Sequence, residues 1–284
     1  MRAPRVSVSS RRTGDHVLSM RGIDKRFGAV RALSGVDFRV REGEVVALVG
    51  DNGAGKSTLV KVLAGVHPAD AGTIELDGEL VQLSSPADAQ DLGIATVFQD
   101  LALCENLDVV ANLWLGRELI DHGRLDEVGM EERTWMLLRE LAAKIPSVRV
   151  PVSTLSGGQR QTVAIARSLI GEPRIVILDE PTAALGVAQT AEVLNLIERL
   201  RDRGHGVILI SHNLTDVLAV ADRIVVLRLG RNNGEFDAET ATSEVLIAAI
   251  TGALDSPRPL PPPEEPHAPV IPLAGARRRL DGDR

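Results

Sequence analysis

The chain has 284 residues, of which 44% are hydrophobic and 25% charged, enough for one large or two small domains with a full core. The net charge of −7 argues against a nucleic-acid partner, and the single cysteine, Cys104, excludes an intrachain disulfide and fits a reducing cytoplasm. No apolar run approaches the roughly 18 residues that a membrane-spanning helix needs, so any role at a membrane is expected to depend on a partner.

The two ends of the chain differ in composition from the rest. Residues 1–16 are basic but lack the apolar core of a secretory signal, and they are predicted to form a flexible tail. Eight of the 15 prolines fall in the last 30 residues. Because such a segment cannot bury enough apolar surface to fold, residues 253–284 are predicted to be disordered, which leaves 17–252 as the folded domain.

The folded region opens with predicted strands. The stretches VLSMRGI (17–23) and VDFRVR (36–41) lean toward alternation, and EVVALV (44–49) is a continuous apolar run typical of a buried parallel strand. A glycine-rich stretch follows, and then STLVKVLAG (57–65), whose apolar residues recur at helical spacing. The predicted order is therefore strand, glycine loop, helix.

The glycine-rich stretch, GDNGAGKST, matches the nucleotide-binding loop pattern G-x-x-x-x-G-K-[ST] in full. Glycine lets backbone N–H groups converge on phosphate oxygens, and the helix that starts here points its positive end at the same place. In this mechanism Lys56 reaches the β- and γ-phosphates, and the Ser57 hydroxyl ligates Mg²⁺. The predicted ATP-binding residues of the loop are Gly50, Asp51, Asn52, Gly53, Ala54, Gly55, Lys56, Ser57 and Thr58.

The middle of the chain changes character. TIELDGELV (73–81) predicts a hairpin that turns at Asp77–Gly78, and GIATVFQ (93–99) predicts a short strand. From about residue 101 the pattern becomes helical and more polar. A helical subdomain is therefore expected over about 101–165, inserted into the α/β core.

Alternating strands and helices return after this insertion. RIVILDEP (174–181) and GVILISH (206–212) read as apolar strands, and the helix between them places Val193, Leu196, Ile197 and Leu200 on one face. Strand, helix and strand at this length indicate a parallel crossover. RIVVLRLGRNNGEF (223–236) is then predicted to form a hairpin with Asn233–Gly234 in its turn. The fold class is α/β, with a mainly parallel sheet.

Polar residues follow three of the predicted strands. Asp179 and Glu180 end one strand, His212 ends the next, and Gln99 ends a third. Ligands of open α/β sheets bind at the carboxyl edge of the strands. Asp179 is therefore assigned to the magnesium shell, Glu180 to polarising the attacking water, and His212 to the γ-phosphate and the orientation of that water.

A second anion site is suggested by LSGGQ (155–159), which opens a predicted amphipathic helix. Ser156 and Gln159 have the spacing of a capping box, and on local sequence alone this is an ordinary helix start. The same helix start could instead hold a phosphate on its backbone N–H groups.

Taken in order, GDNGAGKST, Gln99, LSGGQ, ILDE and His212 resemble the nucleotide-binding subunit of an ABC transporter, over roughly residues 17–250. The resemblance implies a P-loop NTPase core with an N-terminal antiparallel β subdomain and the inserted helical subdomain. It also implies a head-to-tail dimer, in which Ser156, Gly157, Gly158 and Gln159 close over the ATP that the partner's loop holds.

The resemblance implies roles for further residues of the expected site. Phe27, in KRFGAVRAL, falls at the position of the adenine-stacking aromatic. Gln99 falls at the position that senses the γ-phosphate, contributes to the metal site and touches the membrane partner. One departure stands out: Gly186 occupies a position where the family usually has an aspartate that helps link the two ATP sites.

The details are similar to the ATPases of bacterial monosaccharide importers of the ribose, xylose and fructose type, as in LDVVANLWLGRE and DEPTAALGVAQ. The expected partners are a second copy or a second ATPase subunit, an integral permease, and indirectly an extracytoplasmic sugar-binding protein. The expected location is the cytoplasmic face of the plasma membrane. Four alternatives remain: a subunit for another solute, a soluble ABC ATPase of translation or DNA repair, a P-loop kinase, and a regulator that does not hydrolyse ATP.

Overall fold

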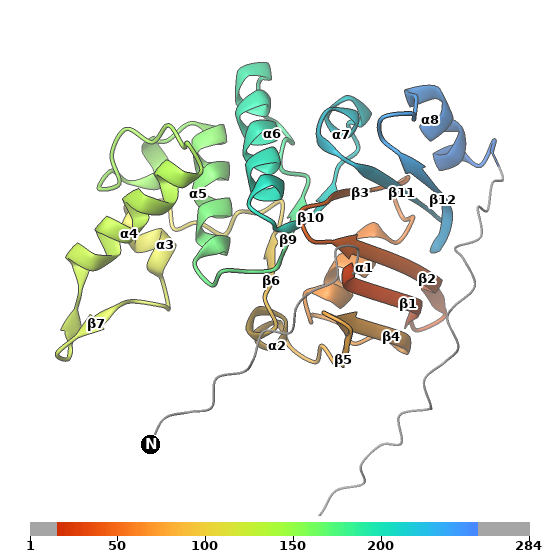
Figure 1. Cartoon of the computed structure of the whole chain (residues 1–284), viewed down its shortest axis with the longest axis horizontal. Coiled ribbons are helices and arrows are strands. Elements are labelled where there is room, and N and C mark those ends of the chain that lie inside the picture. The colour runs from red at the N-terminus through yellow and green to blue at the C-terminus, as the bar shows by residue number, and fades with distance from the viewer. Residues whose placement is uncertain (1–15, 255–284) are drawn as a thin grey trace, which may run out of the picture.

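The computed structural model describes residues 16–254, which fold around two β-sheets (Figure 1). The predicted tails therefore lie outside the described residues, except at His16, Ala253 and Leu254. One sheet is antiparallel and has the strand order β2-β1-β4-β5. Its strands are β1 (His16–Phe27), β2 (Val30–Arg41), β4 (Ala71–Leu76) and β5 (Glu79–Val81). The last two form the predicted hairpin, with both Asp77 and Gly78 at positive φ.

The larger sheet has the order β12-β11-β3-β10-β9-β6, and every neighbouring pair is parallel except β11 and β12. Its strands are β3 (Val45–Val49), β6 (Ile94–Val97), β9 (Ile175–Asp179), β10 (Gly206–Ile210), β11 (Arg223–Arg228) and β12 (Arg231–Asp237). All five residues of β3 and of β10 are buried. These strands read as unbroken apolar runs because both of their faces are covered.

Helices cover this sheet on its two faces (Figure 1). Their bounds are α1 (Lys56–Leu63), α2 (Pro86–Asp91), α3 (Val109–Trp114), α4 (Glu127–Glu140), α5 (Gly157–Leu169), α6 (Val187–Asp202), α7 (Leu214–Val220) and α8 (Ser243–Thr251). Helix α1 shares a hydrophobic cluster with the antiparallel sheet, whereas α5 and α6 share one with the opposite face. Among residues 16–254, no helix has both the length and the hydropathy to cross a bilayer.

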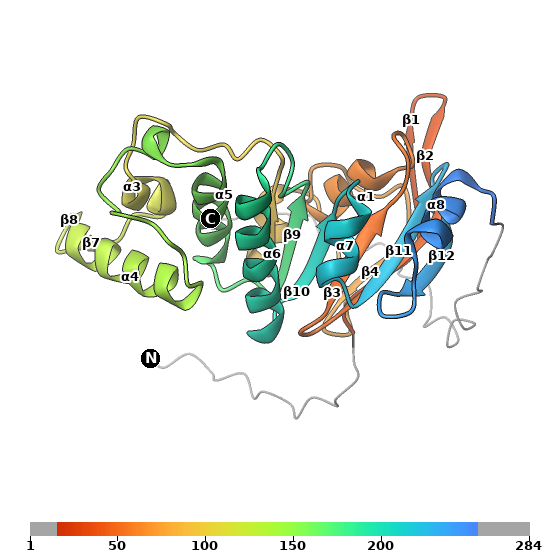
Figure 2. The same cartoon turned by 90° about the horizontal axis from the view of Figure 1, so that it is seen from above.

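The segment between β6 and β9 carries the helices α3, α4 and α5, which stand at the end of the molecule away from the antiparallel sheet (Figure 2). A short hairpin of β7 (Ile120–Asp121) and β8 (Arg124–Leu125) precedes α4, and a 3₁₀ turn spans Val152–Thr154. The buried indole of Trp114 donates to Thr134 Oγ1 over 3.0 Å, which ties α3 to α4. The predicted fold class, including the inserted helical subdomain, is confirmed.

The predicted turn of the last hairpin is wrong. The turn lies at Leu229–Gly230, both at positive φ, and Asn233 and Gly234 lie inside β12. The pairing of β11 with β12 shifts register between Val225 and Leu227, which is the mark of a bulge. There Asn233 donates its side-chain amide to the carbonyl of Ala249 in α8, over 2.6 Å. The Asn-Gly pair therefore forms a bulge, not a turn, and this bulge contacts α8.

Candidate nucleotide-binding site

The loop Gly50–Gly55 joins the end of β3 to the start of α1. Gly50 has φ 154° and Gly55 has φ 108°, which side chains disfavour. A Cβ on Gly50 would overlap the carbonyl oxygen of Leu227 in β11, and one on Gly55 would lie 2.9 Å from the carbonyl oxygen of Ala32 in β2. The glycines therefore let the loop sit tightly between the two sheets, with the N-terminus of α1 at its end.

Lys56 lies across the loop that precedes it. Its Nζ donates to the carbonyl oxygens of Gly50 at 2.7 Å and of Asp51 at 3.0 Å. Burial lowers the pKa of Lys56, and the charges of Glu180 and Asp179 work against that shift. The lysine head group is thus held close to two carboxylates at the carboxyl end of β9, at the place where an anionic ligand would meet it.

Glu180 and His212 form a direct contact at the carboxyl edge of β9 and β10. The Nδ1 atom of His212 lies 2.8 Å from Oε2 of Glu180. Glu180 has φ 52°, and its backbone N–H donates to the carbonyl of Ile210 at the end of β10. This unusual backbone conformation turns the Glu180 side chain toward the neighbouring strand, so two residues that lie far apart in sequence meet.

Asp179 ends β9 opposite Ile210, which in turn pairs with β3 just before the loop. Burial and the adjacent Glu180 raise the pKa of Asp179 above its ordinary value, against the charges of Lys56 and Lys61. A partly buried carboxylate of this kind benefits from a cation. Together with the Ser57 hydroxyl and the Gln99 amide it offers hard oxygen donors, a set that fits Mg²⁺ completed by phosphate oxygens and water.

Gln99 and Phe27 do not line the pocket beside the phosphate loop. Gln99 is exposed two residues beyond β6, which pairs with β9, so it lies on the same sheet edge as Asp179. The Phe27 ring is 44% exposed at the end of β1 and packs edge-on against His67, with the centroids 5.1 Å apart. Its role in stacking adenine stays a prediction.

A pocket of 560 Å³ opens beside the loop. It is lined by Val30, Arg31, Ala32, Asn52, Gly53, Ala54, Gly55, Lys56, Ser57, Thr58, Leu229 and Gly230. Seven of the nine predicted loop residues, from Asn52 to Thr58, line this pocket, and Gly50 and Asp51 do not. Val30, Leu229 and Gly230 were not predicted from sequence, and the Leu-Gly turn that brings two of them here carries no motif that could have marked it.

The LSGGQ segment lies outside that pocket, on the helical subdomain. Ser156 caps α5: its Oγ accepts from the N–H of Gln159 at 3.2 Å, and its own N–H donates to Gln159 Oε1 at 2.9 Å. Ser156 is exposed, and the predicted capping box is present. One copy of the chain therefore presents the two predicted phosphate-binding ends on separate surfaces.

Gly157 and Gly158 allow the start of α5 to lie close to the start of α6. A Cβ on Gly158 would lie 3.0 Å from Cβ of Gln189, and one on Gly157 would lie 3.0 Å from Leu185. Gly186 caps α6, has φ −75°, and would meet nothing within 4 Å if it carried a Cβ. The departure from the family's aspartate is therefore not forced by local packing.

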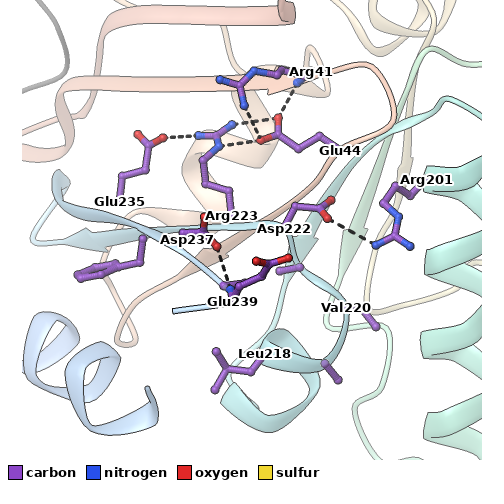
Figure 3. A pocket seen from close by; sticks show the side chains of 14 residues that line it. Arg41, Glu44, Arg201, Leu218, Val220, Asp222, Arg223, Glu235, Asp237 and Glu239 are labelled. Carbon is purple, nitrogen blue, oxygen red and sulfur yellow. Dashed lines mark hydrogen bonds and ion pairs between the residues drawn. The ribbon is translucent and has the colours of Figure 1, made fainter. Parts of the chain in front are cut away.

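A larger cavity of 760 Å³ lies at the opposite edge of the main sheet, where β3 and β11 begin (Figure 3). Most of its charged side chains form ion pairs with one another. Arg223 binds Glu44 at 2.8 Å and Glu235 at 2.8 Å, and Arg201 lies 3.5 Å from Asp222. Burial works to raise the pKa of Glu44, but the hydrogen bonds and charge of Arg223 outweigh it and lower that pKa. We interpret this cluster as a structural ion-pair network.

Comparisons with known proteins agree with the geometry. A family model described as "ABC transporter" matches residues 33–183. The chain is 46% identical over 215 residues to the xylose/arabinose import ATP-binding protein XylG of Sulfolobus acidocaldarius, covering 76% of this chain and 86% of the relative. It is 44% identical over 250 residues to the fructose import ATP-binding protein FrcA of Rhizobium meliloti, covering 85% and 96%.

Among solved structures, the fold is similar to the ADP conformation of an ATP-binding cassette of an ABC transporter. The TM-score is 0.71 at 27% identity, covering 84% of this chain and 95% of that one. Motif order, site geometry and these similarities agree, and the chain belongs to the ABC transporter family, as one of its ATP-binding subunits.

Proposed function

We propose that the chain hydrolyses ATP to energise a membrane permease that imports a simple sugar, at the cytoplasmic face of the plasma membrane. The observation that carries the hydrolytic part is the contact between Glu180 and His212 beside Lys56. The sugar-import part rests on the relatives named above, which are import ATP-binding proteins for xylose/arabinose and for fructose.

The proposed reaction divides the work between the phosphate loop after β3 and the polar residues that follow β9 and β10. The loop N–H groups and Lys56 bind the phosphates, and Glu180 polarises the attacking water while His212 holds the carboxylate in place. Ser57, Asp179 and Gln99 would hold Mg²⁺, which neutralises charge that develops on the phosphate oxygens. Burial of Asp179 favours metal binding, since a bound cation relieves the cost of a desolvated carboxylate.

The proposed assembly is a head-to-tail pair of cassettes, either two copies of this chain or this chain with a second ATPase subunit. This proposal is based on the position of Ser156, which does not line the loop pocket. Within one copy, the phosphate loop and the N-terminus of α5 therefore cannot act on the same phosphate. In the pair, the N-terminus of α5 would supply N–H groups to the γ-phosphate in the partner's loop. ATP would then favour the closed pair because it binds both halves at once.

Reconstitution with the permease tests this function. The chain, its permease and the sugar-binding protein are placed in proteoliposomes, and phosphate release and sugar uptake are measured with and without sugar. We expect sugar to stimulate ATP turnover, and EDTA to abolish both turnover and uptake. Turnover that ignores the permease and sugar, or transport that persists without Mg²⁺, would contradict the proposal.

A further inference from the structure

Two exposed apolar side chains are among the residues that line the loop pocket. Val30 is 65% exposed at the start of β2, and Leu229 is 76% exposed in the turn between β11 and β12. Single exposed apolar residues are common on protein surfaces. These two, however, line one pocket together with the phosphate loop, although they come from opposite ends of the domain.

Leu229 also adopts a backbone conformation that costs it free energy. Its φ is 48°, in the left-handed region that glycine and asparagine tolerate and that bulky side chains disfavour. An asparagine or aspartate would suit this turn position better. Burial of the Leu229 side chain does not offset the strain, because most of it faces solvent. Strained residues of this kind cluster at ligand sites.

The turn that carries Leu229 is anchored to the loop. The N–H of Gly230 donates to the carbonyl of Ala54 in the loop over 2.9 Å, and the N–H of Ser34 in β2 donates to the Gly230 carbonyl over 2.8 Å. A Cβ on Gly230 would lie 2.6 Å from the Ala32 carbonyl oxygen, so the turn sits directly against β2. Leu229 is thereby held at a fixed place relative to the phosphate-binding N–H groups.

The lining of the pocket therefore combines polar groups with apolar side chains. Loop N–H groups and Lys56 suit an anionic phosphate chain, and Val30 and Leu229 suit a flat, weakly polar ring. ATP likewise combines an anionic phosphate chain with a flat, weakly polar nucleoside base. We infer that Leu229, with Val30, packs against the nucleoside of the bound nucleotide and contributes to nucleotide affinity. This inference rests on the proposed ATP-binding function and adds a contact to the predicted stacking on Phe27.

The substitution Leu229→Asn separates this role from folding. Because asparagine accepts positive φ, the variant should unfold at the same temperature as the unmodified chain or at a higher one. Loss of the apolar contact should nevertheless weaken the binding of ATP and of ADP about tenfold, the effect of roughly one buried branched side chain. Inorganic tripolyphosphate, which has no nucleoside, should bind both forms equally.

Titration calorimetry with ATP, ADP and tripolyphosphate measures these affinities, and thermal unfolding accompanies it. Val30→Asn should weaken ATP and ADP binding in the same selective way. Leu80→Asn is the matched control, since Leu80 is 53% exposed on β5 and does not line the pocket, and it should change none of the three affinities.

Two results would overturn the inference while leaving the proposed function intact. The first is unchanged ATP and ADP affinity in Leu229→Asn. The second is an equal loss for tripolyphosphate, which would mean that Leu229 acts only on the shape of the phosphate loop. Failure of the unmodified chain to bind or hydrolyse ATP would instead refute the proposed function itself, and the inference with it.

Discussion

The Nδ1 atom of His212 lies 2.8 Å from Oε2 of Glu180, and the Glu180 side chain is only 17% exposed, against 75% for His212. The histidine therefore covers the carboxylate from the solvent side. With Nδ1 protonated, the ring donates to Glu180 and leaves Nε2 pointing away from that carboxylate. This arrangement fixes the carboxylate and leaves the histidine one further nitrogen for a ligand.

Glu180→Gln should lower the rate of ATP turnover by roughly 10²–10⁴-fold, because an amide cannot accept a proton from the attacking water. Nucleotide affinity should stay within a few-fold, since the phosphate loop is untouched. Phosphate release and equilibrium ATP binding measure the two effects. Glu132→Gln, an exposed carboxylate on α4, is the control and should change neither.

His212→Ala should also slow turnover, and the double variant with Glu180→Gln should be hardly slower than Glu180→Gln alone. Residues that act as a unit lose their effects together rather than additively. If the fold-reductions of the two single variants multiply in the double variant, the histidine works independently of the Glu180 carboxylate.

Ser156→Asp separates the two roles of the LSGGQ serine. Aspartate is as good an N-cap as serine, so the unfolding temperature should change little, whereas Ser156→Ala should cost about 1 kcal/mol of stability. The added negative charge would face the partner's γ-phosphate and should abolish ATP-dependent pairing, which light scattering with the Glu180→Gln background can follow. Thr242→Asp makes the same charge change at the N-cap of α8 and should leave pairing intact.

Gly186→Asp introduces the acid that the sequence resemblance led us to expect at this position. The structure leaves room for it, since φ is −75° and a Cβ would meet nothing within 4 Å. As the N-cap of α6, aspartate should raise stability by a few tenths of a kcal/mol. If the acid links the two ATP sites, the Hill coefficient of turnover should rise. A clear drop in unfolding temperature would contradict the local geometry.

The Arg223–Glu44 pair should make stability depend on acid pH. The folded state lowers the pKa of Glu44 from its ordinary value of 4.5. The stabilisation is therefore complete above that value and is lost as the pH falls through the lower, folded-state value. Urea unfolding between pH 7 and pH 3 should show the loss.

Glu44→Gln should flatten this pH profile and cost about 2 kcal/mol at pH 7. That is less than the ~3–5 kcal/mol typical of a fully broken buried pair, because Glu235 remains bound to Arg223. A profile as steep as that of the unmodified chain would assign the acid sensitivity to other carboxylates.

Long apolar runs and strong periodicity made most of the fold predictable from sequence. Val193, Leu196, Ile197 and Leu200 are buried on one face of α6, as their spacing predicted. The last hairpin was mispredicted because Asn-Gly is the strongest local turn signal, and here contact with α8 overrides it. The true turn uses Leu229 at positive φ, which no propensity would select.

The site was predictable where one motif or one strand end defines it. The loop glycines, Asp179 and Glu180 lie where the strand pattern placed them. The direct contact of Glu180 with His212 depends on a positive φ at Glu180 and on the neighbouring register of β9 and β10, which sequence spacing does not specify. Val30 and Leu229 were missed because only the tertiary approach of β2 to the last hairpin brings them together.

The position of β3 in the main sheet affects the order in which the sheet can form during synthesis. This strand lies between β11 and β10, both of which come from sequence after residue 205. During synthesis the apolar β3 emerges long before either neighbour exists, and such non-local pairing folds slowly. The N-terminal part of the new chain therefore leaves the apolar β3 without either neighbouring strand until residues 206–228 have been made, and an unpaired apolar strand is prone to aggregation during that time.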